Sequence, residues 1–177
     1  MSDMIMSSHE REAMAKMQVM ERRLVDREAI VASLPVRDEA VDVGGDGKFR
    51  SVKKVIKPST ERFVLPGERV TVRYTGWVVP TAVVEEAVRR KFEPPFDTSP
   101  GFSFTLGAMD VISGWEMGVG TMRIGERAYL VLAPEHAYGS AGAGSTIPPN
   151  ATSSAASSPS SSSSTTASST TRNSPKI

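Results

Sequence analysis

Apolar residues recur at strand spacing in two stretches, and a third stretch is a compact apolar run of strand length. In residues 69–77, Val70, Val72 and Tyr74 fall on one face, so we expect Tyr74 to point into the core. A Pro-Gly pair at 66–67 predicts a tight turn that leads into this strand. Residues 50–57 also alternate, and the run 127–133 ends at Pro134. These patterns predict three strands.

A charged helix is predicted near the N-terminus, from Ser7 or Ser8 to about Ala32, and Leu34-Pro35 ends it. Its apolar stripe contains Met14, Met17, Met20 and Leu24. We interpret this helix as a solvated extension. The alternative is a partner-binding or short coiled-coil helix, for which methionine side chains offer an adaptable apolar surface.

A second, short helix is predicted around residues 110–120. Val111, Ile112, Trp115 and Val119 form one apolar stripe, with Asp110 as the expected N-cap and Gly118 and Gly120 as exit signals. Glycine and proline are frequent from residue 138 to residue 149, which predicts a shaped loop after the strand 127–133.

The cysteine and histidine counts and the charge balance exclude several classes of function. With no cysteine and only two histidines, the 177-residue chain offers no disulfide, thiol catalysis or credible metal cluster, so we expect no metal and no cofactor. A net charge of +1 provides no field for nucleic acid or an anionic membrane. We find no apolar run of about 20 residues and no targeting segment, and we expect a cytoplasmic or nuclear protein.

The length suits one globular domain with appendages. We assign residues 1–40 to the helical extension, 41–152 to the domain and 153–177 to a tail. The tail consists mostly of serine, threonine and alanine, a composition with little to bury, and is expected to be disordered.

The ordered motifs between Val70 and Ala151 resemble an FKBP-type peptidyl-prolyl isomerase domain. They are VTVRYTG at 70–76, FD at 96–97, FSFTLG at 102–107, VISGWEMG at 111–118, MRIGERA at 122–128, AYG at 137–139 and IPPNA at 147–151. The resemblance implies an α+β fold in which a twisted antiparallel sheet wraps one short helix. It also implies an enzyme that isomerises X–Pro bonds of polypeptides, assists protein folding as a chaperone does, and binds macrolide inhibitors.

The resemblance also implies the roles of nine site residues. The floor under the prolyl ring would be Trp115, and the walls would be Phe96, Phe102, Val111 and Ile147. The catalytic group would be Tyr74, Asp97, Ile112 through its backbone N–H, and Tyr138 through its hydroxyl. No nucleophile is required, because bond rotation is the only chemistry. His136 receives no role.

Three departures from the family pattern affect these expectations. Residues 78–95 form an insertion with a helix-like segment at 81–91, which we interpret as a surface insertion, with a partner-recognition element as the alternative. The loop 98–101 lacks an arginine beside Asp97. The residues after Thr152 do not favour a strand, so we expect the domain to lack its final strand and an aromatic pocket wall, and to be weakly stable and poorly active. The alternative function is therefore a non-catalytic binding or chaperone module.

Overall fold

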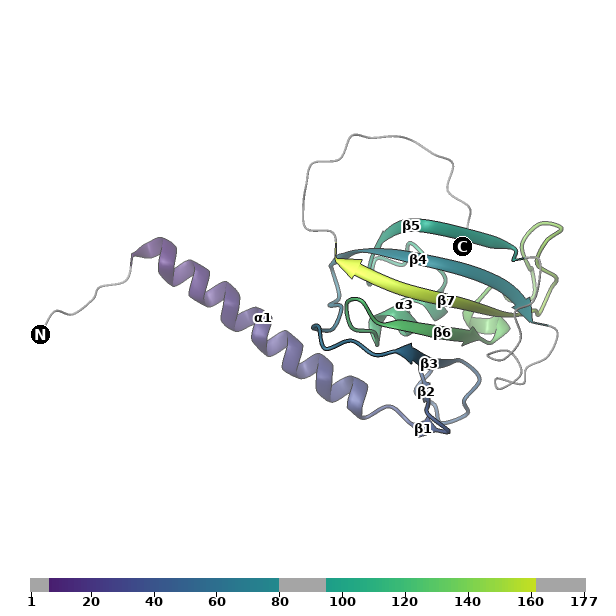
Figure 1. The fold of residues 1–177 in the computed structure, drawn as a ribbon, viewed down its shortest axis with the longest axis horizontal. Coiled ribbons are helices and arrows are strands. Elements are labelled where there is room, and N and C mark those ends of the chain that lie inside the picture. Colours follow the sequence, from purple (N-terminus) through teal and green to yellow (C-terminus); the bar gives the residue numbers. More distant parts are fainter. Residues whose placement is uncertain (1–6, 80–94, 162–177) are drawn as a thin grey trace, which may run out of the picture. The chain divides into compact units, whose positions relative to one another are not determined.

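The computed structural model describes residues 7–79 and 95–161 (Figure 1). The chain divides after Ser33 into two compact units, a helical unit and a sheet unit that starts at Leu34. The predicted boundary at residue 40 therefore falls inside the sheet unit. The predicted helix at 81–91 and the tail from residue 162 lie outside the described residues.

Helix α1 (Ser8–Ala32) confirms the N-terminal helix predicted from the sequence. Its start is a capping box, in which the Ser7 hydroxyl accepts the Glu10 N–H at 3.2 Å and Glu10 accepts the Ser7 N–H at 2.7 Å. At its end, the Ser33 N–H donates to the Ala29 carbonyl at 3.1 Å. No residue of α1 is buried.

The second unit is built on a seven-stranded sheet with the strand order β1-β2-β3-β6-β7-β4-β5, and every neighbouring pair is antiparallel. The strands are β1 (Val36–Arg37), β2 (Ala40–Asp42), β3 (Val52–Lys57), β4 (Arg69–Val79), β5 (Asp97–Thr105), β6 (Arg127–Leu132) and β7 (Thr152–Ser161). The short helix α3 (Ser113–Gly120) lies behind the sheet in Figure 1. The α+β sheet-on-helix fold expected from the sequence is confirmed.

The main core lies between α3 and the inner face of the sheet. Val70, Val72 and Tyr74 of β4 are buried there, as their alternation predicted. Glycines allow α3 to approach β6 closely, because a Cβ on Gly114 would lie 2.6 Å from Leu132 Cδ1 and one on Gly118 would lie 2.7 Å from Leu130 Cδ1. The predicted turn at 66–67 is also present: Glu68 N–H donates to the Leu65 carbonyl, and Gly67 has a φ of +85°.

The prediction that the final strand is missing is wrong. Residues 152–161 form β7, which pairs with β4 on one side and β6 on the other, so the strand is central in the sheet (Figure 1). The reason is that two partner strands satisfy the backbone of this segment, while its side chains contribute little apolar area. The predicted disordered tail therefore cannot begin at residue 153.

Two local predictions are also wrong. Asp110 does not cap α3: the N-cap is Ile112, which makes no side-chain cap bond, and an Asp110 carboxylate oxygen instead accepts the Thr105 N–H at 3.5 Å. Residues 98–101 are part of β5 rather than a loop, and their pairing with β4 shifts between Val72 and Tyr74 in the manner of a β-bulge.

Candidate active site

A small cavity opens between the inner face of the sheet, α3 and the loop that follows β6. Five of the nine predicted site residues line it: Tyr74, Phe96, Ile112, Trp115 and Tyr138. They come from β4, the residue before β5, the N-cap and first turn of α3, and the loop after the 3₁₀ helix η1 (Pro134–His136). Residues far apart in sequence thus converge on one site.

Trp115 forms the centre of an aromatic cluster. Its ring lies edge-on to that of Tyr74, with centroids 4.7 Å apart, and to that of Phe102, with centroids 6.2 Å apart. Edge-to-face geometry is the arrangement that aromatic quadrupoles favour. Because Trp115 is only 2% exposed and is packed by Phe104 as well, its indole is a rigid base for the cavity.

The Tyr74 hydroxyl donates a short hydrogen bond to a carboxylate oxygen of Asp97, and the other Asp97 oxygen accepts the Thr98 N–H at 2.8 Å. Asp97 therefore has two donors without the arginine whose absence the sequence revealed. Burial raises the pKa of Tyr74, and the hydrogen bond to Asp97 raises it further, so the hydroxyl stays protonated.

Two hydrogen-bond donors at the cavity have no acceptor among the described residues. The Ile112 N–H is at the N-terminus of α3, where the first backbone N–H groups lack partners within the helix. The Tyr138 hydroxyl has no hydrogen bond to a described residue either, although its ring lies edge-on to Phe96 with a centroid distance of 6.0 Å. Burial, followed by the negative charge of Asp97, raises the pKa of Tyr138 to about 12. Both groups can therefore donate to a ligand carbonyl.

The other predicted wall residues lie outside the cavity lining. Val111 is buried in the core cluster, and Phe102 packs against that cluster. Ile147 is buried inside the loop, where it exchanges two backbone hydrogen bonds with Ala143 at 2.9 and 3.1 Å. This pairing shapes the loop, and Gly142 is needed beside it because a Cβ there would lie 2.3 Å from the Ile147 carbonyl oxygen.

Four lining residues were missed by sequence reasoning: Leu132, Ser153, Ser154 and Ala155. Leu132 is the last residue of β6, a strand that the sequence predicted. Its close approach to Gly114 of α3 becomes apparent only in the folded structure, so the sequence did not identify it as a lining residue. The other three belong to β7. Ala155 is buried in the core cluster, and the Ser153 hydroxyl is buried without a described partner. The wall expected to carry an aromatic residue is thus made of small side chains.

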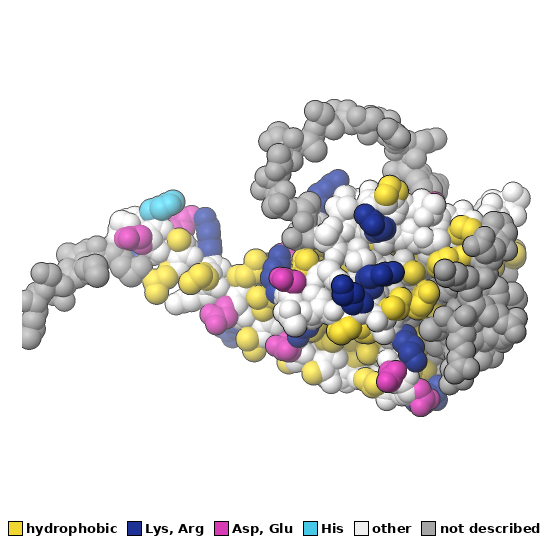
Figure 2. Space-filling model, viewed as in Figure 1, with side chains coloured by type: hydrophobic (Ala, Val, Ile, Leu, Met, Phe, Trp, Pro, Cys, Tyr) yellow, Lys and Arg dark blue, Asp and Glu magenta, His cyan; other side chains and the backbone are white. Residues whose placement is uncertain are grey.

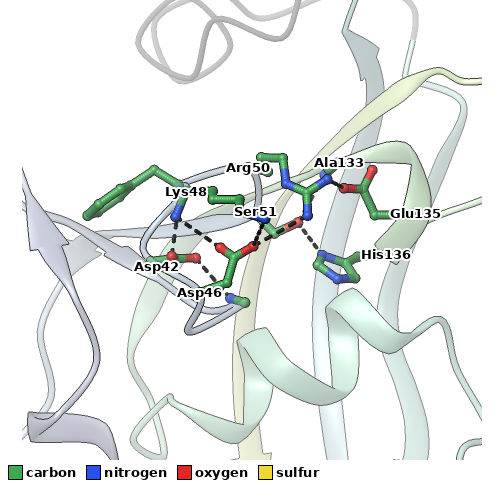
Figure 3. Close-up of polar contacts among 10 residues, drawn as sticks. Asp42, Asp46, Lys48, Arg50, Ser51, Ala133, Glu135 and His136 are labelled. Carbon is green, nitrogen blue, oxygen red and sulfur yellow. Dashed lines mark hydrogen bonds and ion pairs between the residues drawn. The ribbon is translucent and has the colours of Figure 1, made fainter.

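A polar cluster fixes the base of the loop (Figure 3). The buried Ser51 hydroxyl accepts the Ala133 N–H at 3.0 Å and lies 2.7 Å from His136 Nδ1. Arg50 forms an ion pair with Glu135 beside it. His136, which received no role from the sequence, therefore ties η1 to the segment before β3, and the loop that carries Tyr138 starts from this anchored point.

The described residues contain no group of three or more histidine, aspartate or glutamate side chains arranged to hold a metal ion. In the same residues, no helix has the length and apolar character needed to cross a membrane.

Comparison with known proteins places this geometry in a family. Residues 60–153 match the family described as FKBP-type peptidyl-prolyl cis-trans isomerase. Human peptidyl-prolyl cis-trans isomerase FKBP4 is 39% identical over 68% of this chain, and the match covers 25% of that protein. FK506-binding protein 2 of Candida glabrata is 42% identical over 59% of this chain and 71% of its own length.

A solved structure agrees with these matches. The peptidyl-prolyl cis-trans isomerase of Pseudomonas syringae superposes with a TM-score of 0.56 and 25% identity, covering 80% of this chain and 93% of the other. The chain spans about a quarter of the length of its FKBP4 relatives, but most of the length of the shorter ones. The chain therefore belongs to the family of FKBP-type peptidyl-prolyl cis-trans isomerases.

Proposed function

We propose that this chain catalyses cis-trans isomerisation of X–Pro bonds in polypeptides, at the cavity over Trp115. The observation that carries the proposal is a pair of donors without an acceptor among the described residues, the Ile112 N–H and the Tyr138 hydroxyl, at a cavity that the Trp115 indole also lines. Such a site can hold a substrate by two carbonyl oxygens while the ring rests on the indole.

The physical basis of catalysis is the difference between planar and twisted amides. Amide resonance opposes rotation by about 18–20 kcal/mol, and the planar form is the more dipolar of the two. A largely apolar cavity favours the twisted form relative to the planar one, because the twisted form loses less solvation on entering. Donors that grip the flanking carbonyls hold the chain while the bond turns.

We assign the predicted roles on this basis. Trp115 is the floor, Tyr74 and Phe96 are walls, and Asp97 fixes the Tyr74 ring through its hydroxyl. Phe102 and Val111 support Trp115 from the core, and Ile147 keeps the loop in shape.

A protease-coupled assay on an X–Pro tetrapeptide tests the proposal. We expect Tyr138→Phe to lower kcat/KM about tenfold or more, the usual scale for one hydrogen bond that strengthens in the transition state. Tyr129→Phe is the matched control, since Tyr129 is a half-buried tyrosine of β6 outside the cavity. Absence of isomerase activity in the folded parent chain would refute the proposal.

A macrolide is the second probe of the same site. The Candida glabrata relative is named for binding FK506, and we propose that this chain binds that ligand over Trp115. Addition of FK506 should change the Trp115 fluorescence of the chain and block the assay. Trp77 is the other tryptophan, so a Trp77→Phe variant is needed to isolate the signal.

The alternative function, a non-catalytic binding or chaperone module, was based on a missing final strand, and β7 occupies that place. It keeps one supporting feature, the small Ala155 at the wall of the cavity. A chain that binds FK506 but does not accelerate isomerisation would favour it. A protein partner of α1 or of the insertion 78–95 remains a prediction, which a pull-down that compares the full chain with a chain lacking residues 1–33 would test. A cytoplasmic or nuclear location also remains a prediction, and cell fractionation would test it.

A further inference from the structure

The outer face of the sheet, opposite the cavity, carries a groove that follows β7. The groove arises because the outward side chains of β7 are small, including Ala156 and Ser158, while both neighbouring strands carry arginine. Arg73 of β4 pairs in register with Ser158, and Arg127 begins β6 on the other side. A trough with an arginine on each wall is the result.

The two arginines lie in nearly the same cross-strand row. Ala128 pairs with Ser157, so the preceding residue Arg127 lies beside Ser158. Strands are about 4.8 Å apart, which places the backbones of Arg73 and Arg127 about 10 Å from each other with Ser158 between them. Two arginine side chains can reach one group over that span.

The polar groups of this row are available to a ligand. Both arginines are exposed, and neither guanidinium forms an ion pair or hydrogen bond with a residue in the described ranges. The Ser158 hydroxyl likewise has no such partner. In contrast, Ser160 donates to the Thr71 carbonyl at 3.1 Å, and Thr71 bonds to Ser103 at 2.7 Å. The free groups are therefore concentrated at one point of the groove.

The charge of the groove has one sign. Among its described lining residues there are two arginines and no carboxylate. Figure 2 shows Lys and Arg side chains gathered over the middle of this face. Since guanidinium groups bind phosphate oxygens in bidentate geometry, the row is suited to one dianionic phosphate.

We propose that this groove binds the phosphate monoester of a phosphoserine or phosphothreonine side chain in a polypeptide partner. Arg73 and Arg127 donate to the phosphate from opposite sides, and Ser158 donates from below. Apolar side chains along the same groove, Ile56 and Pro100, contact the peptide that carries the phosphate. A single row with two arginines fits one phosphate group, whereas a nucleic acid presents a regular series of phosphates. Because Ser158 lies at the bottom of the groove, the row favours a group that can enter the groove, which the headgroups of a flat membrane surface do less readily.

Fluorescence anisotropy with a labelled Gly-Gly-Ala-phosphoSer-Ala-Gly-Gly peptide tests this site. The peptide contains no proline, so binding at the cavity does not contribute. We expect saturable binding that the unphosphorylated peptide lacks. Arg73→Gln and Arg127→Gln should each weaken it at least tenfold, and Ser158→Leu should weaken it by filling the groove without a change of charge.

Arg69→Gln is the matched control, because it removes the same charge from the exposed start of β4, outside the groove. It should leave binding within about twofold. Equal binding of the unphosphorylated peptide, or equal losses in Arg69→Gln and Arg73→Gln, would overturn the site. Inorganic phosphate that competes as well as the peptide would overturn the assignment to a polypeptide. Thermal melts by circular dichroism check that each variant is folded.

Discussion

The hydrogen bond between Tyr74 and Asp97 offers the sharpest test of how the cavity is held together. Tyr74→Phe keeps the ring, and with it the 4.7 Å contact with Trp115, but leaves one Asp97 oxygen without its donor. Asp97→Val leaves the Tyr74 hydroxyl, in a 3% exposed residue, without its acceptor. The two variants therefore break the same bond from opposite ends.

The expected cost follows from the charge and burial of the partners. A hydrogen bond to a charged group contributes about 1.5–3 kcal/mol, and a buried group left unsatisfied costs about 1–3 kcal/mol. Each single variant should lower the free energy of unfolding by such an amount. The double variant removes both partners, so its loss should be smaller than the sum of the two single losses by about 1–2 kcal/mol.

Urea unfolding followed by circular dichroism measures the three losses, and the coupled assay measures kcat/KM for the same proteins. We expect both single variants to lose isomerase activity at temperatures where they remain folded, because Asp97 no longer fixes the Tyr74 ring. Strictly additive losses of stability would refute the coupling. Parent-like rates in both single variants would refute the roles of Tyr74 and Asp97 in the site.

Three further predictions follow from other contacts. Lys53→Met should lower the free energy of unfolding in urea by about 3–5 kcal/mol, because it leaves the carboxylate of Glu126, a 5% exposed residue, without its 2.9 Å ion pair. A loss below about 1 kcal/mol would contradict the importance of this buried ion pair. Gly114→Ala should be destabilising by about 1–3 kcal/mol and slow isomerisation, since its Cβ would lie 2.7 Å from a backbone oxygen of His136; a melting temperature equal to that of the parent would contradict this packing. The pKa of Tyr138 is raised to about 12 from about 10, so kcat/KM should not fall through ionisation of this hydroxyl up to pH 10. The free energy of unfolding should fall between pH 10 and 12, because Tyr138 ionises in the unfolded chain before it does so in the folded chain. A decrease of kcat/KM with a midpoint near pH 10 would contradict the raised pKa.

Sequence patterns predicted those parts of the fold in which the spacing of apolar or capping side chains determines the local structure. The alternation of Val70, Val72 and Tyr74 identified the inner face of β4, and the predicted start of the N-terminal helix at Ser7 or Ser8 agrees with the first residue of α1, Ser8. Five of the nine predicted site residues line one cavity, since the motifs that carry them are placed by the fold itself.

The parts that the sequence did not predict depend on contacts between distant segments. The inner face of β7 carries serine and alanine, as in Ser153 and Ala155, so its sequence lacks the alternation of large apolar residues that would predict a strand. Its backbone is nevertheless hydrogen-bonded to a neighbouring strand on both sides, and the intrinsic strand propensities of its side chains do not include this contribution. The same limit applies to Asp97, whose donors come from the neighbouring strand and from the next residue rather than from an arginine nearby in sequence.

The position of β7 has a consequence for how the chain folds. It is the last described strand along the chain, yet it joins β4 to β6 at the centre of the sheet. Until it docks, β3–β6 and β4–β5 form two separate ribbons, each with an open edge that can pair with another molecule. Contacts of such long sequence separation also form slowly. We therefore expect chains shortened before residue 152 to aggregate rather than fold, and refolding of the full chain to be limited by the docking of this one strand.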